Sequence, residues 1–401
     1  MIEPVKTQWS KIQYMALARA FSLLGTELTI FTLVFREKDQ GPAAVAALFI
    51  VGTLPSILFA PLAGTIADRF STRQVIPIGS VIGGASIFAL SQPLDTWAIW
   101  LFLFIANSCA SVVGPTWGKL TPTLAKKEDI GRAMGTIQSY FSIAGLFGPA
   151  VAGILVAQTG YFITFIIDAI ATTFIAFVPY LIKVNHKPEA LKDGEKTDLA
   201  GGFKFMFRSP LLRSLVILVF GMVLCISVVN VGDVFLLTDI MGADSFIYGL
   251  VGTGFALGTL LFSAIASAKK VKPRTELIIL GYGMAILSLS GFAVGVAPNY
   301  WVIMGVWFVA GMANATINSY GVGMMIKVTP HEVQGRVFAA FGSIIAVASI
   351  GSMSVAGYLI GAFGVREVFV IAGLLAFVAF VMLFPTVYKE QTKIIKASSA
   401  S

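Results

Sequence analysis

The chain has 401 residues, of which 57% are hydrophobic and only 12% are charged, about half of the charged share of a soluble globular protein. This composition excludes a soluble protein, because a chain of this length cannot bury so much apolar surface in its core. It also excludes a disordered chain, which needs low hydrophobicity and high charge. Two cysteines exclude a disulfide scaffold, and the net charge of +8 is typical of basic loops on one side of a membrane rather than of nucleic-acid binding.

Twelve apolar stretches follow one another along the chain. Each is continuous and close to the roughly 20 residues that a spanning helix needs, which predicts helices rather than barrel strands. The sequence therefore predicts an all-α membrane protein with twelve transmembrane helices. The stretches are 12–35, 43–67, 74–92, 96–117, 131–157, 160–183, 210–238, 245–268, 275–296, 299–327, 335–361 and 364–387.

The basic residues predict the orientation of these helices. With the N-terminus inside, 24 of the 28 Lys and Arg residues fall in inner segments, and the outer loops hold only Arg36, Lys38 and Arg366. The remaining one, Arg19, lies within the first stretch. Because inner loops carry the excess of basic residues, both termini are expected in the cytoplasm.

One long polar segment, 184–209, divides the chain into an N-terminal six-helix bundle, 1–183, and a C-terminal six-helix bundle, 210–401. Apolar residues at helical spacing in Asp198–Arg208, with Asp198 as N-cap, predict a short amphipathic helix on the inner membrane surface. A plain disordered linker is the alternative.

The two halves repeat one another. Gly131–Arg132, Ala152–Gly153, Gly160 and Phe165 recur at one constant offset, as Gly335–Arg336, Ala356–Gly357, Gly364 and Phe369. A constant offset through two helices indicates duplication, and two like halves imply a pseudo-two-fold axis along the membrane normal with a cavity between them.

The loop after the second stretch carries a recognisable motif. Gly64, Asp68, Arg69 and Arg73 match the pattern G-x-x-x-D-R/K-x-G-x-R/K-R/K, while Ser71 and Gln74 depart from it. Here the chain resembles the major facilitator superfamily, which implies two pseudo-symmetric six-helix bundles. The resemblance also implies a gate latch in which Asp68 faces the cytoplasmic end of the eleventh helix, near Gly335–Arg336, where a carboxylate gains from the helix dipole.

The fifth stretch contains Gly145, Gly148, Pro149 and Gly153, which resemble the antiporter motif of exporters in this superfamily. Pro149 is expected to kink the helix and the glycines to admit a close neighbour. Phe21–Ser22, Gly25–Thr26, Leu54–Pro55 and Ile167–Asp168–Ala169 resemble the branch that includes macrolide-efflux proteins and the enterobactin exporter. The fourth stretch lacks the arginine that many proton-coupled drug exporters carry there.

Charged residues inside the spans are the candidates for proton coupling, because each costs roughly 2.5–3.5 kcal/mol at a helix centre and persists only with a partner, water or a function. In the family, helices one and seven line the cavity, so Glu27 and Asp233 are expected to face it and to gain and lose a proton as access alternates. For Asp168 a structural hydrogen-bonding role is favoured. Arg19 lies about two turns from Glu27, too far for a direct pair along the helix. A structural partner elsewhere, or snorkelling to the interface, explains Arg19 as well as a coupling role does. These four candidates are Arg19, Glu27, Asp168 and Asp233.

Polar and aromatic residues on the expected cavity helices are candidates for substrate contacts in a mostly apolar pocket. They are Asn107, Gln138, Tyr140, Asn230, Asn314, Asn318 and Tyr320.

Motifs of enzymes and cofactor sites are absent from the sequence. Both histidines, His186 and His331, fall in inner loops, so no intramembrane metal site is expected, and no G-x-x-x-x-G-K-[ST], H-E-x-x-H or G-x-S-x-G occurs. We therefore expect no enzyme and no cofactor, with protons as the coupling ion.

The favoured hypothesis is a secondary active transporter in a bacterial inner membrane that exports drugs and other hydrophobic or amphiphilic compounds, which would confer antibiotic resistance. A narrow-specificity exporter of one siderophore, lipid or metabolite on the same fold is the alternative. A non-transporting receptor or assembly factor is a third possibility, which lacks a soluble domain to support it. The expected partners are a small-molecule substrate and the lipid bilayer, with no nucleic acid, and the chain is expected to be a monomer.

Overall fold

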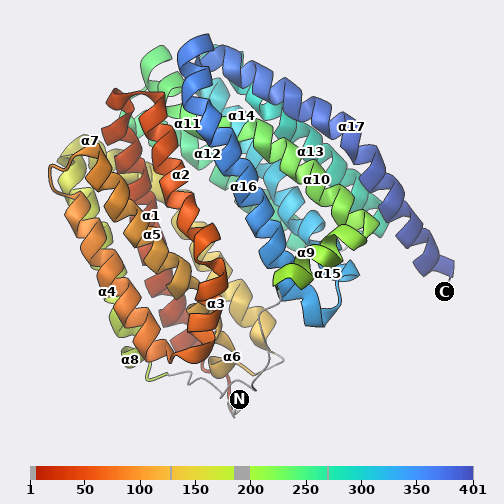
Figure 1. Cartoon of the computed structure of the whole chain (residues 1–401), viewed down its shortest axis with the longest axis horizontal. Coiled ribbons are helices and arrows are strands. Elements are labelled where there is room, and N and C mark those ends of the chain that lie inside the picture. Colours follow the sequence, from red (N-terminus) through yellow and green to blue (C-terminus); the bar gives the residue numbers. More distant parts are fainter. Residues whose placement is uncertain (1–5, 127–128, 185–198, 269–270, 401) are drawn as a thin grey trace. The chain divides into compact units, whose positions relative to one another are not determined.

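The computed structural model describes residues 6–126, 129–184, 199–268 and 271–400, which form helices joined by short loops and contain no strand. The chain divides into two compact units (Figure 1). Unit 1 contains Met1–Asp39 and Ile50–Thr197, and unit 2 contains Gln40–Phe49 and Asp198–Ser401.

Unit 1 is built around α1, which packs along α7, while α4 packs on α5 and α7. Its core includes Ile12, Met15, Trp117 and Leu120, all nearly inaccessible to solvent. The helices of this part are α1 (Trp9–Glu37), α2 (Pro42–Leu58, shared with unit 2), α3 (Ala60–Arg69), α4 (Thr72–Leu90), α5 (Thr96–Gly118), α6 (Thr121–Leu124), α7 (Ile130–Phe174) and α8 (Val178–Leu181).

Unit 2 repeats this pattern, with α10 packed on α16 and α17, α12 on α14, and α13 on α17. Two π-helical segments, η4 (Phe235–Ile240) and η5 (Ile317–Gly321), interrupt its seventh and tenth predicted stretches. The helices are α9 (Leu199–Arg208), α10 (Pro210–Ile226), α11 (Val228–Val234), α12 (Ser245–Ala268), α13 (Pro273–Gly295), α14 (Tyr300–Thr316), α15 (Val322–Val328), α16 (His331–Phe363) and α17 (Val365–Ala400).

Ten helical stretches of the described residues are long and apolar enough to cross a membrane. The fifth and sixth predicted spans form one continuous stretch, Arg132–Leu181, which departs from helical geometry at Gly160. The second predicted span is divided at Phe59 into α2 and α3, where Pro61 lacks the N–H that would continue the ladder. The chain is thus a multi-pass membrane protein, and twelve separate spans remain a prediction.

The predicted repeat is visible in the packing of α7, α16 and α17. Gly160 and Gly364 both have positive φ, +72° and +88°, a backbone conformation that residues other than glycine rarely adopt. Five residues after each glycine, Phe165 and Phe369 are both fully buried, and eight residues before it Ala152 and Ala356 are too. The same residue types therefore break the helix and fill the core in both halves.

Two of the three basic residues predicted for outer loops close the ends of helices. Arg36 donates from its guanidinium to the carbonyls of Leu90, Gln92 and Leu94 at the C-terminal end of α4. Arg366 donates to the carbonyls of Gly295 and Ala297 at the end of α13. Each arginine satisfies carbonyls that have no partner within the helix.

The predicted short helix is present as α9, and part of its apolar face packs on unit 2 while Phe207 is exposed. Its place on the membrane surface remains a prediction. Met206 is fully buried in the core of unit 2, and Phe203 packs against the same core. A Cβ atom added at Gly202 would clash with the carbonyl oxygen of Arg336 in α16. The predicted N-cap, Asp198, lies outside the described residues.

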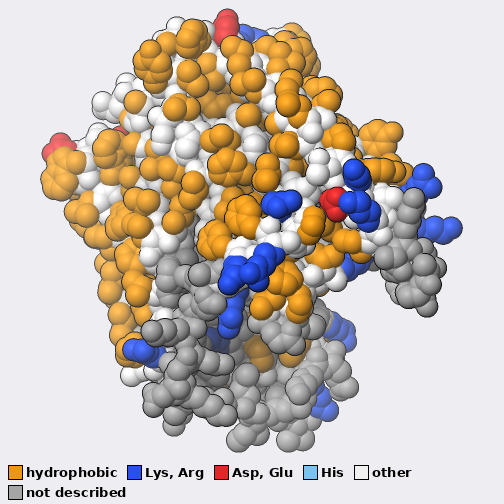
Figure 2. Space-filling model, turned by 45° about the vertical axis from the view of Figure 1, so that its right-hand side comes forward, with side chains coloured by type: hydrophobic (Ala, Val, Ile, Leu, Met, Phe, Trp, Pro, Cys, Tyr) orange, Lys and Arg blue, Asp and Glu red, His pale blue; other side chains and the backbone are white. Residues whose placement is uncertain are grey.

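The surface is as apolar as a lipid-facing surface requires. Large side chains such as Tyr358, Met382 and Tyr282 are more than two-thirds exposed, at 77%, 72% and 70%. Figure 2 shows hydrophobic side chains spread over most of the visible face, with more Lys and Arg toward its lower part. Such surface is stable only against hydrocarbon.

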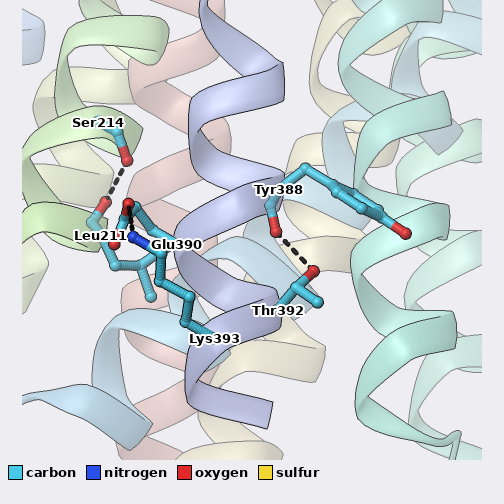
Figure 3. Close-up of polar contacts among 6 residues, drawn as sticks. All are labelled: Leu211, Ser214, Tyr388, Glu390, Thr392 and Lys393. Atoms are coloured by element: carbon cyan, nitrogen blue, oxygen red, sulfur yellow. Dashed lines mark hydrogen bonds and ion pairs between the residues drawn. The ribbon is translucent and has the colours of Figure 1, made fainter. Parts of the chain in front are cut away.

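Polar side chains within these helices mostly bond locally. Ser214 donates to the carbonyl of Leu211 and Thr392 to that of Tyr388, and Lys393 pairs with Glu390 at 2.7 Å (Figure 3). Bonds of this kind let hydroxyls occupy apolar helices without a partner on another helix. Polar groups that lack such a bond therefore stand out as candidates for function.

Candidate functional site

Glu27 lies on α1 where this helix crosses α7. A Cβ atom added at Gly148 of α7 would lie 2.8 Å from both the Cβ and the Cγ of Glu27, too close for any residue but glycine. Glu27 is half-buried and forms no hydrogen bond or ion pair with the described residues. Glu27, the residue predicted to couple protons, thus packs directly against Gly148 of the predicted antiporter motif.

The other residues of that motif have different surroundings. No atom comes within 4 Å of a Cβ placed at Gly145, so this glycine is not needed for close packing here. Gly153 is buried. The backbone leaves helical geometry at Gly160 and keeps it at Pro149. The expected close approach is therefore found at Gly148.

Asp168 joins α7 to α1 through hydroxyl groups. Thr29 of α1 donates to its Oδ2 at 2.6 Å, and Thr172, one turn later in α7, donates to its Oδ1 at 3.0 Å. The side chain is 1% exposed, and a Cβ at Gly25 would clash with Oδ1. Both oxygens are used within the helix interface, which supports the structural role.

Asp233 is the penultimate residue of α11, two residues before η4, and its side chain is half-buried. The Trp307 side chain of α14 donates a hydrogen bond to its carboxylate, and the Tyr248 phenol of α12 is close enough to interact with its charge. Its Oδ1 atom is buried without a hydrogen-bond partner among the described residues. One carboxylate oxygen is therefore free to hold a proton inside unit 2.

Arg19 lies on α1 between aromatic rings rather than beside a carboxylate. Its guanidinium carbon is 5.5 Å from the ring centre of Trp117 in α5 and 4.8 Å from that of Phe141 in α7. Glu27 is eight residues further along, about 12 Å at 1.5 Å per residue. The expected separation of about two turns rules out a direct pair along the helix.

Where the loop after α3 leads into α4, the two residues that depart from the family pattern, Ser71 and Gln74, bond to each other. The N–H and the hydroxyl of Ser71 both donate to Oε1 of Gln74, at 3.2 and 3.0 Å, which forms a capping box at the start of α4. Arg73 donates to the carbonyl of Val184 and stacks on Tyr180 at 5.5 Å, so it ties the loop to the end of α8. Arg69 is exposed.

Gly64 and Asp68 both belong to α3, but the surroundings of Gly64 and the side chain of Asp68 lie outside the described part of the structure. The latch between Asp68 and the start of α16 therefore remains a prediction. The surroundings of Gly131, one of the positions repeated in the two halves, also lie outside the described part of the structure.

The predicted cavity residues divide between the units. Asn107, Gln138 and Tyr140 are in unit 1, and Asn230, Asn314, Asn318 and Tyr320 are in unit 2. Asn107 and Asn318 each donate to a carbonyl four residues earlier, and Tyr320 meets Phe262 edge to face. Asn318 and Tyr320 lie in η5, and π-helical segments are frequent at functional sites. A shared cavity remains a prediction.

Comparison with known protein families identifies the fold family. The family model of the Major Facilitator Superfamily matches residues 15–238 and 233–400. The chain belongs to the major facilitator superfamily. The resemblance stated from its motifs is confirmed, as is the all-α membrane fold.

Individual relatives of this major facilitator protein are distant. It is 22% identical over 378 residues to macrolide efflux protein A of Streptococcus pyogenes, covering 89% of this chain and 91% of that protein. It is 24% identical over 370 residues to the multidrug efflux pump Tap of Mycobacterium tuberculosis, covering 86% and 85%. A crystal structure of a POT family transporter in complex with 5-aminolevulinic acid shares the fold, with a TM-score of 0.78, 15% identity, and coverage of 95% and 96%.

Several neighbours of the candidate residues in this transporter carry no signal in the sequence. Trp117 and Phe141 beside Arg19 read as ordinary apolar residues of the fourth and fifth stretches. Trp307 and Tyr248 beside Asp233 lie in two further helices. Only the fold brings such residues together, because they lie on different helices and no shared periodicity along the chain links them.

Proposed function

We propose that this major facilitator protein is a proton-coupled exporter of hydrophobic or amphiphilic compounds in a bacterial cytoplasmic membrane. Two six-helix bundles would rock about a central substrate site, so that access alternates between the two sides. Both termini would lie in the cytoplasm.

The placement of Glu27 is the observation that carries this proposal. A carboxylate in a membrane helix is costly without a partner, and Glu27 has none among the described residues. Its carboxylate arm also runs over Gly148, within the part of α7 that resembles the antiporter motif. A carboxylate held in this way is suited to bind a proton on one side and release it on the other.

Asp233 supplies a second candidate for the proton path. Its buried, unpaired Oδ1 and its bond from Trp307 resemble the setting of a group that changes protonation rather than one that only pairs helices. Asp168 contrasts with it, because both of its oxygens accept hydrogen bonds. We therefore assign coupling to Glu27 and Asp233 and helix pairing to Asp168.

The relatives favour efflux as the direction. Two of them are named for macrolide efflux and multidrug efflux, and each aligns along most of this chain. At this identity the names support export of amphiphilic compounds as the starting hypothesis and leave the substrate to experiment.

The test uses inside-out vesicles that contain the full chain and an imposed proton gradient. Proton release is followed with a pH-sensitive dye while ethidium, erythromycin or an anionic fluorescein derivative is added. We expect at least one compound to discharge the gradient with wild-type protein and Glu27→Gln to reduce this flux to the level of empty vesicles, because the amide cannot carry a proton.

Glu390→Gln is the matched control. It makes the same chemical change in a carboxylate that pairs with exposed Lys393, and it should transport like wild type. Full activity in Glu27→Gln would contradict the coupling role. No response to any compound in wild type would favour the narrow-specificity exporter, and a screen of siderophores, lipids and metabolites would then be the next step.

A further inference from the structure

Arg19 occupies an aromatic site inside unit 1. Its guanidinium lies over Phe141 at 4.8 Å and near Trp117 at 5.5 Å, so three helices, α1, α5 and α7, contribute to it. Trp117 is 2% exposed and belongs to the core, whereas Phe141 and Arg19 are half-buried. The rings hold the arginine in place, and the residue as a whole is not fully buried.

Acidic groups of unit 1 do not neutralise this arginine in the described structure. Arg19 makes no hydrogen bond and no ion pair with the described residues. The oxygens of Asp168 accept from Thr29 and Thr172, and Asp129 accepts from Thr7 near the start of α1. Glu37, Asp39 and Asp95 lie toward the opposite ends of α1 and α5.

Ring contacts satisfy only part of what a guanidinium requires. A cation–π contact uses the face of the ring and contributes about 0.5–2 kcal/mol, but it leaves the five N–H donors in the guanidinium plane unpaired. In a membrane protein such donors are costly. Their fork geometry matches a carboxylate, sulfonate or phosphate, which it binds through two parallel hydrogen bonds.

We propose that Arg19 binds the anionic group of the transported compound, with Phe141 and its neighbours contacting the apolar part of the same molecule. This inference rests on the proposed function and narrows the substrates to amphiphiles that carry a carboxylate, sulfonate or phosphate. A lipid headgroup offers the same chemistry, so the experiment includes an arm that separates the two sources.

The experiment measures equilibrium binding to the full chain in phosphatidylcholine nanodiscs, without a proton gradient. The probes are dansylglycine, which has a carboxylate, and dansylglycinamide, which has the same fluorophore and no charge. Energy transfer from tryptophan to dansyl reports binding. Trp117→Phe, which keeps an aromatic ring beside Arg19, tests whether the probe sits next to this site.

We expect Arg19→Gln to weaken dansylglycine binding by at least about tenfold and to leave dansylglycinamide unchanged, because a hydrogen-bonded charge pair is lost. Arg19→Lys should fall between, since it keeps the charge and loses the fork. Trp117→Phe should lower the energy transfer from tryptophan to bound dansylglycine, because Trp117 lies beside Arg19. Arg132→Gln is the matched control, because Arg132 also stacks on a ring, that of Trp9 at 4.7 Å, but is exposed.

Three results would overturn the proposal: wild type that does not bind dansylglycine, equal affinity in wild type and Arg19→Gln, or an equal loss for the uncharged amide. Loss of dansylglycine binding when phosphatidylglycerol is added, at about 0.15 M salt to screen surface charge, would assign the site to a lipid headgroup instead. If Arg19→Gln is misfolded and does not elute as a single species in size-exclusion chromatography, wild type is compared with Arg19→Lys instead.

The binding assay separates this inference from the proposed function. Dansylglycine binding that depends on Arg19, in a protein without gradient-driven transport, would contradict the function alone. Proton-coupled transport that Arg19→Gln leaves unchanged, with no preference for the carboxylate, would contradict this inference alone.

Discussion

Glu27 and Gly148 show how a single residue shapes a transport site. The Glu27 side chain uses the space that a methyl group at position 148 would fill, so the identity of one residue depends on the other. Gly145, three residues earlier in the same helix, has no such neighbour. The two glycines of one motif therefore allow a comparison between a position in contact with Glu27 and one that is not.

We predict that Gly148→Ala displaces Glu27 and lowers stability by about 1–3 kcal/mol, the usual cost of overpacking. Gradient-driven transport should fall with it, while Gly145→Ala stays near wild type. Thermal unfolding and vesicle transport of both variants measure this.

A double-variant cycle with Glu27→Ala provides the control. Once the Glu27 side chain is shortened, the alanine at 148 should cost much less, which gives a coupling energy between the two positions. Additive costs would mean that Gly148 serves another neighbour.

Single residues also explain departures from the family motif. Ser71 and Gln74 replace a glycine and a basic residue, and the two replacements bond to each other as a capping box. Compared with the family pattern alone, the two replacements count as the loss of a glycine and the loss of a basic residue. Only together do they stabilise the first turn of α4.

At the scale of helices, α9 is held against the rest of unit 2 by close packing. Met206 is buried and Gly202 lies against the backbone of α16 at Arg336. A backbone oxygen cannot move as a flexible side chain can. The close packing of α9 on α16 therefore requires glycine at this position.

We predict that Gly202→Ala loosens α9 from α16 and speeds trypsin cleavage after Lys204 and Arg208, which are exposed. Cleavage is followed over time by mass spectrometry of the folded protein. Gly342→Ala is the matched control, because Gly342 lies in α16 with no atom within 4 Å of an added Cβ. Equal cleavage of both variants would show that α9 is held by other contacts.

At the scale of the whole molecule, charge and hydrophobicity act together. Apolar side chains cover the visible surface, and Arg36 and Arg366, two of the few basic residues predicted to face outside, are used to close α4 and α13. The remaining basic residues are left to orient the chain. Their distribution predicts both termini inside.

We predict that fusions at the C-terminus and after Arg274 yield fluorescent green fluorescent protein and inactive alkaline phosphatase, and that fusions after Asn299 yield the reverse. Fluorescence and phosphatase activity in intact bacteria measure this. Phosphatase activity at the C-terminus would contradict the predicted cytoplasmic C-terminus.

The amino-acid sequence alone predicted the membrane class, the all-α fold and the family, which the comparisons confirm, together with a repeat of the two halves. These follow from composition, from the length of apolar stretches and from motifs, which are local properties of the chain. The pair Gly160 and Gly364 could also be found in this way, because a repeat at constant offset marks positions with the same backbone role.

The partners of the polar residues, in contrast, depend on how the helices pack. The sequence places Arg19, Glu27, Asp168 and Asp233 in apolar helices, and the family resemblance separates Glu27 and Asp233 from the other two, but the partners of all four are not encoded locally. Helix packing gives Asp168 two hydroxyl donors, places Arg19 between two rings, leaves Glu27 over a glycine and leaves one oxygen of Asp233 unpaired. Hydrogen bonds and ring contacts depend on distances between helices, and no local pattern encodes those distances.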